Sequence, residues 1–183
     1  KLVNAADRRT PLGRRDYAIV TCLSELGLRG SDVANLTIGG IDFAARVMQI
    51  RQRKEREAAT FPMTPRLCSA LKAYLGSSRP DCKSVAVFVR HHAPVGKPLT
   101  SLGICNVVLR LATQAGLRHR VHGAHVLRRS FASRLLNAGA TLKQIADFLG
   151  HTSIDTTSLY AKVDLATLSR VALPWPERKA VRS

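Results

Sequence analysis

Three segments of the chain hold histidine, arginine and tyrosine side chains in a pattern that suits phosphoryl transfer. His125 and Arg128 stand three residues apart in "AHVLRRSFASRLL", and "LGHTSIDTTSLY" contains His151 and Tyr160. Far upstream, Arg29 lies in "LGLRGSDVANL". Attack of a tyrosine on a phosphodiester places negative charge on the non-bridging oxygens, which planar guanidinium groups match geometrically while staying charged. The set predicts phosphoryl transfer without a metal, with tyrosine as the covalent carrier.

These segments resemble the signature boxes of the tyrosine recombinases, the phage integrase type. "GLRGSDVANL" is similar to the first arginine box, "HVLRRSFAS" to the His-x-x-Arg box, and "LGHTSIDTTSLYAKV" to the box with the second histidine and the nucleophilic tyrosine. The boxes stand in the family's order and at family-like separations, although Arg129 replaces a common histidine. The resemblance implies the catalytic-domain fold of this family, which is α+β and mainly helical.

The resemblance also implies how the residues divide the reaction. Tyr160 attacks a DNA phosphate and leaves a 3′-phosphotyrosyl link and a free 5′-hydroxyl. A free tyrosine has a pKa of about 10, so its proton must leave during or before attack. His125 is expected to assist this proton transfer. Arg29 and Arg128 clamp the non-bridging oxygens, and His151 donates a further hydrogen bond. No cofactor or metal is implied.

A lysine is expected to protonate the departing 5′ oxygen, and Lys54 is the candidate. Short apolar stretches within residues 37–63 predict a small antiparallel sheet around a charged turn. Lys54 stands in this turn, eight residues before Pro62, and the family places its lysine in such a turn ahead of a proline. Neighbouring arginines leave the choice open, and the alternative is a solvated hairpin tip that touches phosphates.

Composition favours a nucleic-acid partner. The 183 residues include 29 Lys and Arg against 12 Asp and Glu, a net charge of +17. A pI near 11.0 points to a polyanion, and no isolated basic amphipathic helix indicates a membrane surface instead. No apolar run is long enough to span a membrane. We expect double-stranded DNA as the partner. The resemblance further implies a homo-oligomer, a tetramer on paired DNA sites. It also implies a protein of the bacterial cytoplasm that is associated with the nucleoid and originates from a phage or mobile element.

Cysteine spacing indicates structural thiols. The four cysteines have no Cys-x-x-Cys pair and stand far apart, at Cys22, Cys68, Cys82 and Cys105. They are expected to be buried thiols in a reducing cytoplasm. The alternative is a zinc site shared with His91 and His92, which we interpret as loop residues because the short ligand pairs of such sites are missing.

Local signals place Arg29 between two helices. An apolar stripe predicts a helix over residues 16–28 that ends with the help of Gly27. Ser31 is expected to cap a short second helix that continues to Leu36. Further helices are expected to begin at Thr64 with Pro65, at Thr100 or Ser101, at His125, and at Thr141, while residues 84–89 form a buried strand or extended segment.

The chain divides into three parts in this interpretation. Residues 1–13 are a linker remnant, residues 14–173 a catalytic domain, and residues 174–183 a basic C-terminal tail. The family places a helical DNA-clamping domain ahead of the catalytic one, and no segment here resembles it. The family often docks its tail on a neighbouring protomer, and the alternative is a tail that folds back on its own domain.

Two other functions use the same residues differently. A type IB topoisomerase would relax supercoils through related chemistry with little site preference. A helix-turn-helix regulator would use the Gly150 turn to bind DNA, making His151 a turn residue and Tyr160 a core or groove contact. That second function leaves Arg29 and the His125–Arg128 pair without a task.

Overall fold

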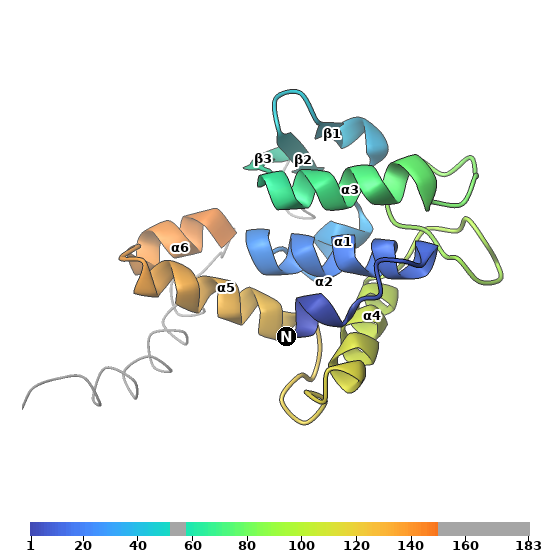
Figure 1. Cartoon of the computed structure of the whole chain (residues 1–183). Helices are drawn as coiled ribbons and strands as arrows, with labels where there is room; N and C mark the ends of the chain where they lie inside the picture. The colour runs from blue at the N-terminus through green and yellow to red at the C-terminus, as the bar shows by residue number, and fades with distance from the viewer. Residues whose placement is uncertain (52–57, 150–183) are drawn as a thin grey trace, which may run out of the picture. The chain divides into compact units, whose positions relative to one another are not determined.

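The computed structural model of the chain describes residues 1–51 and 58–149, which form helices and one small sheet (Figure 1). The elements are η1 (Leu2–Ala5), α1 (Pro11–Leu26), α2 (Gly30–Ala34), η2 (Ile38–Gly40), β1 (Ile41–Asp42), β2 (Val47–Arg51), β3 (Ala58–Pro62), α3 (Pro65–Ser77), α4 (Ser101–Gln114), α5 (His125–Asn137) and α6 (Leu142–Leu149). The chain forms two compact units, of which the first ends at Phe131. The mainly helical α+β class is confirmed.

The sheet consists of three antiparallel strands in the order β1-β2-β3. In this register Met48 lies opposite Ile41 on one side and Phe61 on the other. Met48, Ile50 and Phe61 are buried, whereas the side chain of Gln49 between them is exposed. This alternation is what a sheet with one covered face requires. The sheet predicted near residues 37–63 is therefore confirmed.

Helix α1 is the centre of the first unit and packs against α3. It begins at Pro11, not at Asp16 as its apolar stripe predicts, because Thr10 caps it by accepting a hydrogen bond from the Gly13 amide at 3.0 Å. The start of the helix lacks apolar periodicity since Arg15 and Asp16, its fifth and sixth residues, are buried as an ion pair. A periodicity argument takes such residues for solvent-facing ones, which explains the late predicted start.

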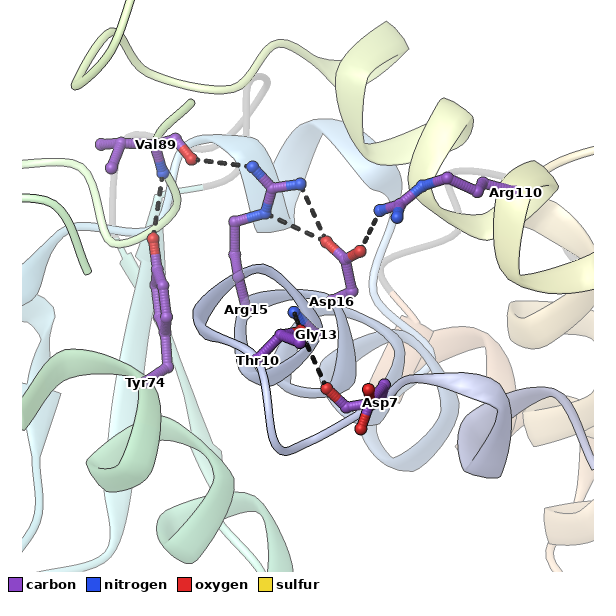
Figure 2. A network of polar contacts seen from close by, with 8 residues as sticks. All are labelled: Asp7, Thr10, Gly13, Arg15, Asp16, Tyr74, Val89 and Arg110. Atoms are coloured by element: carbon purple, nitrogen blue, oxygen red, sulfur yellow. Dashed lines mark hydrogen bonds and ion pairs between the residues drawn. The ribbon is translucent and has the colours of Figure 1, made fainter. Parts of the chain in front are cut away.

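The residues ahead of α1 pack closely against its first turn, as Figure 2 shows. The Thr10 hydroxyl donates to the carbonyl oxygen of Asp7 at 3.1 Å, so the chain doubles back over Gly13. A Cβ atom at Gly13 would overlap that carbonyl oxygen, which is backbone and has no flexible end to move away. Leu2 and Ala6, in the same N-terminal stretch, are buried in the core.

We expect Gly13→Ala to destabilise the chain although alanine is the better helix former. The helix-propensity gain is about 1 kcal/mol, while overlap in a packed region costs about 1 to 3 kcal/mol or more. Gly76→Ala in α3 is the matched control because nothing lies within 4 Å of its added Cβ. Denaturant unfolding should show a net loss for Gly13→Ala and none for Gly76→Ala. Equal stability of the two variants would refute the close approach.

The remaining predicted elements of the first unit follow their capping residues. Thr64 caps α3 by accepting from the Leu67 amide at 3.1 Å, and Thr100 caps α4 by accepting from the Gly103 amide at 3.1 Å. Residues 84–89 form an extended segment with two isolated bridges, one from Ala86 to Thr37 and one from Val89 to Pro98. Both predicted helix starts are confirmed.

The described part of the second unit runs from Ala132 through α6. Gly139 has a positive φ of 90° after the end of α5, where glycine is favoured. Thr141 then caps α6 by accepting from the Gln144 amide at 3.2 Å. The helix predicted to begin at Thr141 is confirmed. Within residues 1–51 and 58–149, every helix is too short or too polar to cross a lipid bilayer.

Candidate active site

Arg29 stands in the tight connection between α1 and α2. Helix α1 ends at Gly27, whose φ of 61° and ψ of 23° are left-handed and favour glycine. Leu28 is 2% exposed and fixes the connection in the core, and Arg29 follows in an extended conformation as the N-cap of α2. The predicted position of Arg29 between two helix ends is confirmed.

The start of α2 differs from the sequence-based expectation. Ser31 does not cap it; the residue at the N-cap is Arg29, and its amide donates to Asp32 Oδ2 at 3.0 Å. Asp32 is 5% exposed, so this contact is shielded from water. A carboxylate in the first turn also faces the positive end of the helix dipole. The backbone of Arg29 is therefore fixed from the side of α2.

Arg128 is bound to the same connection from a distant part of the chain. Its side chain is buried, with 5% exposed, and Nη1 donates to the carbonyl oxygen of Gly27 at 2.7 Å. The last carbonyls of a helix have no intrahelical partner and form the negative end of the dipole. The Arg128 guanidinium donates to one of them, the carbonyl of Gly27, which stands two residues before Arg29 in the sequence.

His125 is the first residue of α5 and its side chain is exposed. It precedes Arg128 by three residues, so the two side chains lie on neighbouring positions of one helix face. The structure thus brings Arg128 to the connection that holds Arg29, and α5 places His125 next to Arg128. The other predicted residues, Lys54, His151 and Tyr160, lie outside the described residues.

This arrangement has the chemistry of an anion site. A guanidinium fork that is already held by a backbone carbonyl needs little reorganisation when an oxyanion arrives. Arg29 adds a second guanidinium, and its backbone is fixed by Gly27 on one side and by Asp32 on the other. Arg29 and Arg128 both carry guanidinium groups, whose planar donors match the oxygens of a phosphate geometrically.

The four cysteines differ in how deeply they are buried. Cys22 and Cys68 are buried, whereas Cys82 and Cys105 are only half-buried, which corrects the expectation that all four are buried. Burial raises the pKa of the Cys22 thiol to about 12, so this side chain stays protonated at neutral pH. In the described ranges, no three His, Cys, Asp or Glu side chains are grouped as metal ligands.

Sequence reasoning missed two supports of the site. No local sequence signal shows that the Gly27 carbonyl accepts from Arg128, because the two residues are 101 positions apart. A local signal does exist for the hydrogen bond from the Arg29 amide to Asp32. A carboxylate three residues after an N-cap is the spacing of a capping box, and it marks Arg29 as the cap.

We expect Asp32→Ala to loosen the Arg29 connection and lower the free energy of unfolding by about 1 to 2 kcal/mol, the cost of a lost helix cap. Asp32→Asn keeps an oxygen that can accept from the Arg29 amide and should lose less than half as much. Denaturant unfolding of both variants measures the difference. If alanine and asparagine cost the same, the hydrogen bond is not what stabilises the connection.

Comparison with known proteins finds integrases and recombinases that are similar in sequence. The Sinorhizobium fredii protein y4rA, named as an integrase/recombinase, is 38% identical over 176 residues, which cover 96% of this chain and 42% of that protein. The protein y4gC of the same organism is 35% identical, with 96% and 90% covered. Tyrosine recombinase XerC of Pelotomaculum thermopropionicum is 31% identical, with 93% and 57% covered. The chain thus spans about half the length of two of these relatives.

Solved structures share the fold. The crystal structure of XerA recombinase superposes with a TM-score of 0.76 at 27% identity, covering 94% of this chain and 61% of that one. XerH recombinase, in a post-cleavage complex with its difH substrate, gives a TM-score of 0.77 at 24% identity, with 96% and 51% covered. The predicted tyrosine-recombinase catalytic-domain fold is therefore confirmed. Residues 1–166 match the phage integrase family, and the chain belongs to that family.

Proposed function

We propose that this chain cleaves and rejoins DNA strands as the catalytic part of a site-specific recombinase. The observation that carries the proposal is the hydrogen bond from the Arg128 guanidinium to the Gly27 carbonyl, two residues before Arg29. It joins the two arginines of the predicted phosphate clamp through one short piece of backbone. Their shared support is what a reaction centred on a single phosphate needs.

The reaction begins with the attack of the Tyr160 oxygen on a DNA phosphorus. A bond forms between that oxygen and phosphorus, the bond from phosphorus to the 5′ oxygen breaks, and the product is a 3′-phosphotyrosyl link. Arg29 and Arg128 stabilise the charge on the non-bridging oxygens. His125, one turn before Arg128, assists the loss of the tyrosine proton.

Two further residues complete the proton and charge balance. His151 donates a hydrogen bond to the phosphate, and Lys54 gives a proton to the departing 5′ oxygen. Rejoining is the reverse reaction with the 5′-hydroxyl of a second DNA end. The phosphodiester energy is retained in the tyrosyl link, so strand exchange needs no ATP.

The partner in this proposal is double-stranded DNA, and the functional unit is a tetramer on paired sites. The net charge of +17 supports the DNA partner, because phosphate neutralisation supplies most of the affinity of such proteins. Residues 14–173 would form the catalytic domain, with a basic tail beyond them. We place its action in the cytoplasm of a bacterium, on the nucleoid, as part of a mobile element or phage.

The test is covalent capture of DNA. The chain is incubated with a pool of duplexes that carry one nick and a randomised central sequence, so that a cleaved fragment is lost and the tyrosyl link cannot be reversed. We expect protein-linked DNA that survives denaturing electrophoresis, with a common sequence among the recovered fragments. Linked fragments without any shared sequence would support a topoisomerase instead. DNA binding without a covalent product would support a regulator and contradict the proposal.

A further inference from the structure

Helix α4 contacts the start of α2, although none of the predicted site residues lies on α4. The point of contact is Gly30, which follows Arg29 in the chain. A Cβ atom added at Gly30 would stand 3.3 Å from Ser101 Oγ and 3.8 Å from Ile104 Cγ2. Both neighbours are in the first two turns of α4. The backbone beside Arg29 therefore rests directly on the start of this helix.

The segment that leads to His125 returns to the same end of α4. Gly116, with a φ of 68°, lies in the turn just past the end of α4. Gly123, two residues before His125, then lies so close to Cys105 that an added Cβ would stand 3.2 Å from the sulfur atom. Because Cys105 directly follows Ile104, two adjacent residues of one helix contact the two segments that carry Arg29 and His125.

An ion pair fixes α4 farther along its length, as Figure 2 shows. Arg110 of α4 donates to Oδ2 of Asp16 on α1, and the Asp16 side chain is 1% exposed. The other carboxylate oxygen accepts from Arg15 Nε at 3.0 Å and from Arg15 Nη2 at 2.9 Å. The loss of one partner from a buried ion pair is strongly unfavourable. Helix α4 is therefore held at a fixed place on α1.

We propose that Ile104 and Cys105 are positioning residues, which set the placement of Arg29 and His125 relative to one another. Each acts through the glycine that it contacts, and neither has to touch DNA. This inference rests on the proposed function, in which Arg29 and His125 act on one phosphate. A displacement of about 1 Å at such a site costs up to roughly a hundredfold in rate, so the support of the backbone matters for the reaction.

The first test compares Ile104→Ala with Leu111→Ala. The two side chains are 0% and 1% exposed and lose the same number of carbon atoms. Leu111 lies on the same face of α4, about 10 Å farther along the helix axis. Both variants should lower the denaturation midpoint to a similar degree. Cleavage at saturating DNA should fall roughly tenfold or more in Ile104→Ala alone, because the space left beside Gly30 lets Arg29 shift.

Hydrogen exchange of the Arg29 amide measures the same effect without DNA. This amide donates to Asp32 Oδ2 at 3.0 Å, and the bond loosens when α2 loses its support. Exchange should be at least about tenfold faster in Ile104→Ala than in Leu111→Ala, since global destabilisation affects both variants equally. Equal exchange in the two variants overturns the role of Ile104. Ile104→Val and Leu111→Val form a milder pair that is measured in the same way if an alanine variant does not fold.

The second test concerns Cys105. Gly123→Ala places a methyl group against the Cys105 sulfur, which should shift the NMR signals of the His125 ring and slow cleavage roughly tenfold. Adding Cys105→Ala removes the sulfur, so the ring signals should return towards their native positions and cleavage should recover at least about threefold. The φ of 156° at Gly123 strains an alanine equally in both variants, so their difference isolates the contact. A double variant that matches Gly123→Ala in both measurements overturns the role of Cys105.

The recombinase function and the positioning role can fail separately. A native chain that forms no covalent product with DNA contradicts the recombinase function, while amide exchange and the ring signals are still measured without DNA. A native chain that cleaves DNA, with Ile104→Ala as fast as Leu111→Ala, contradicts the positioning role of Ile104 and leaves the recombinase function intact.

Discussion

Tyr160→Phe should abolish the covalent protein–DNA product. Phenylalanine lacks the hydroxyl oxygen that becomes part of the phosphotyrosyl link, so no bond to phosphorus can form. The rest of the ring is unchanged, and DNA affinity, which comes mainly from phosphate contacts of Lys and Arg, should stay within about twofold. The measurement is denaturing electrophoresis after incubation with the nicked duplex pool, together with a binding titration on the same DNA.

The chain contains three tyrosines, and the other two are natural controls. Tyr74 is fully buried in the core, and burial raises the pKa of its hydroxyl. The Tyr17 hydroxyl accepts from Arg66 Nε at 2.9 Å and sits near the surface. Tyr74→Phe and Tyr17→Phe remove the same atom as Tyr160→Phe and should still form the product. If Tyr17→Phe lost the product, or if Tyr160→Phe still formed it, the assignment of Tyr160 as the nucleophile would be wrong.

Local features of the site follow from the sequence because they depend on few neighbouring residues. Gly27 ends α1 in the left-handed conformation, and this alone places Arg29 outside the helix. The His125–Arg128 spacing puts both residues on one helix face once α5 is formed. Signals of this kind need no knowledge of tertiary packing, which is why these predictions are confirmed.

Contacts between distant segments do not follow from the sequence. The bond from Arg128 to Gly27 spans 101 residues and depends on how α5 packs beside the end of α1. The ion pair of Arg110 with Asp16 spans 94 residues and depends on how α4 crosses α1. In both cases local patterns assign the arginine to the surface, whereas in the structure it bonds to a distant segment. No periodicity or capping rule could have found its partner.

The same distinction explains the late predicted start of α1. The periodicity rule assumes that charged residues face water, and Arg15 and Asp16 violate it because each is the buried partner of the other. The roles of Lys54, His151 and Tyr160 stay predictions from the family resemblance, since these residues lie outside the described ranges.

Arg128→Ala should reduce the rate of DNA cleavage roughly a hundredfold or more, as the removal of a preorganised oxyanion donor does in other enzymes. The loss has two physical sources. The phosphate loses a charged donor in the transition state, and the Gly27 carbonyl loses the donor that ties α5 to the Arg29 connection. Single-turnover cleavage at saturating DNA separates this effect from weaker binding.

The substitution also removes a buried side chain, so two further variants are needed to interpret it. Arg128→Lys keeps the charge and most of the volume but cannot offer a planar fork to the Gly27 carbonyl and a phosphate together, and we expect at least a tenfold loss. Arg129→Ala deletes an equal charge from the next position of α5, where the side chain is exposed, and should change cleavage less than threefold. Cleavage that falls equally in Arg128→Ala and Arg129→Ala would show that general positive charge, and not a clamp anchored on Gly27, stabilises the transition state. A lysine variant as fast as the native chain would remove the geometric part of the argument and leave only the charge.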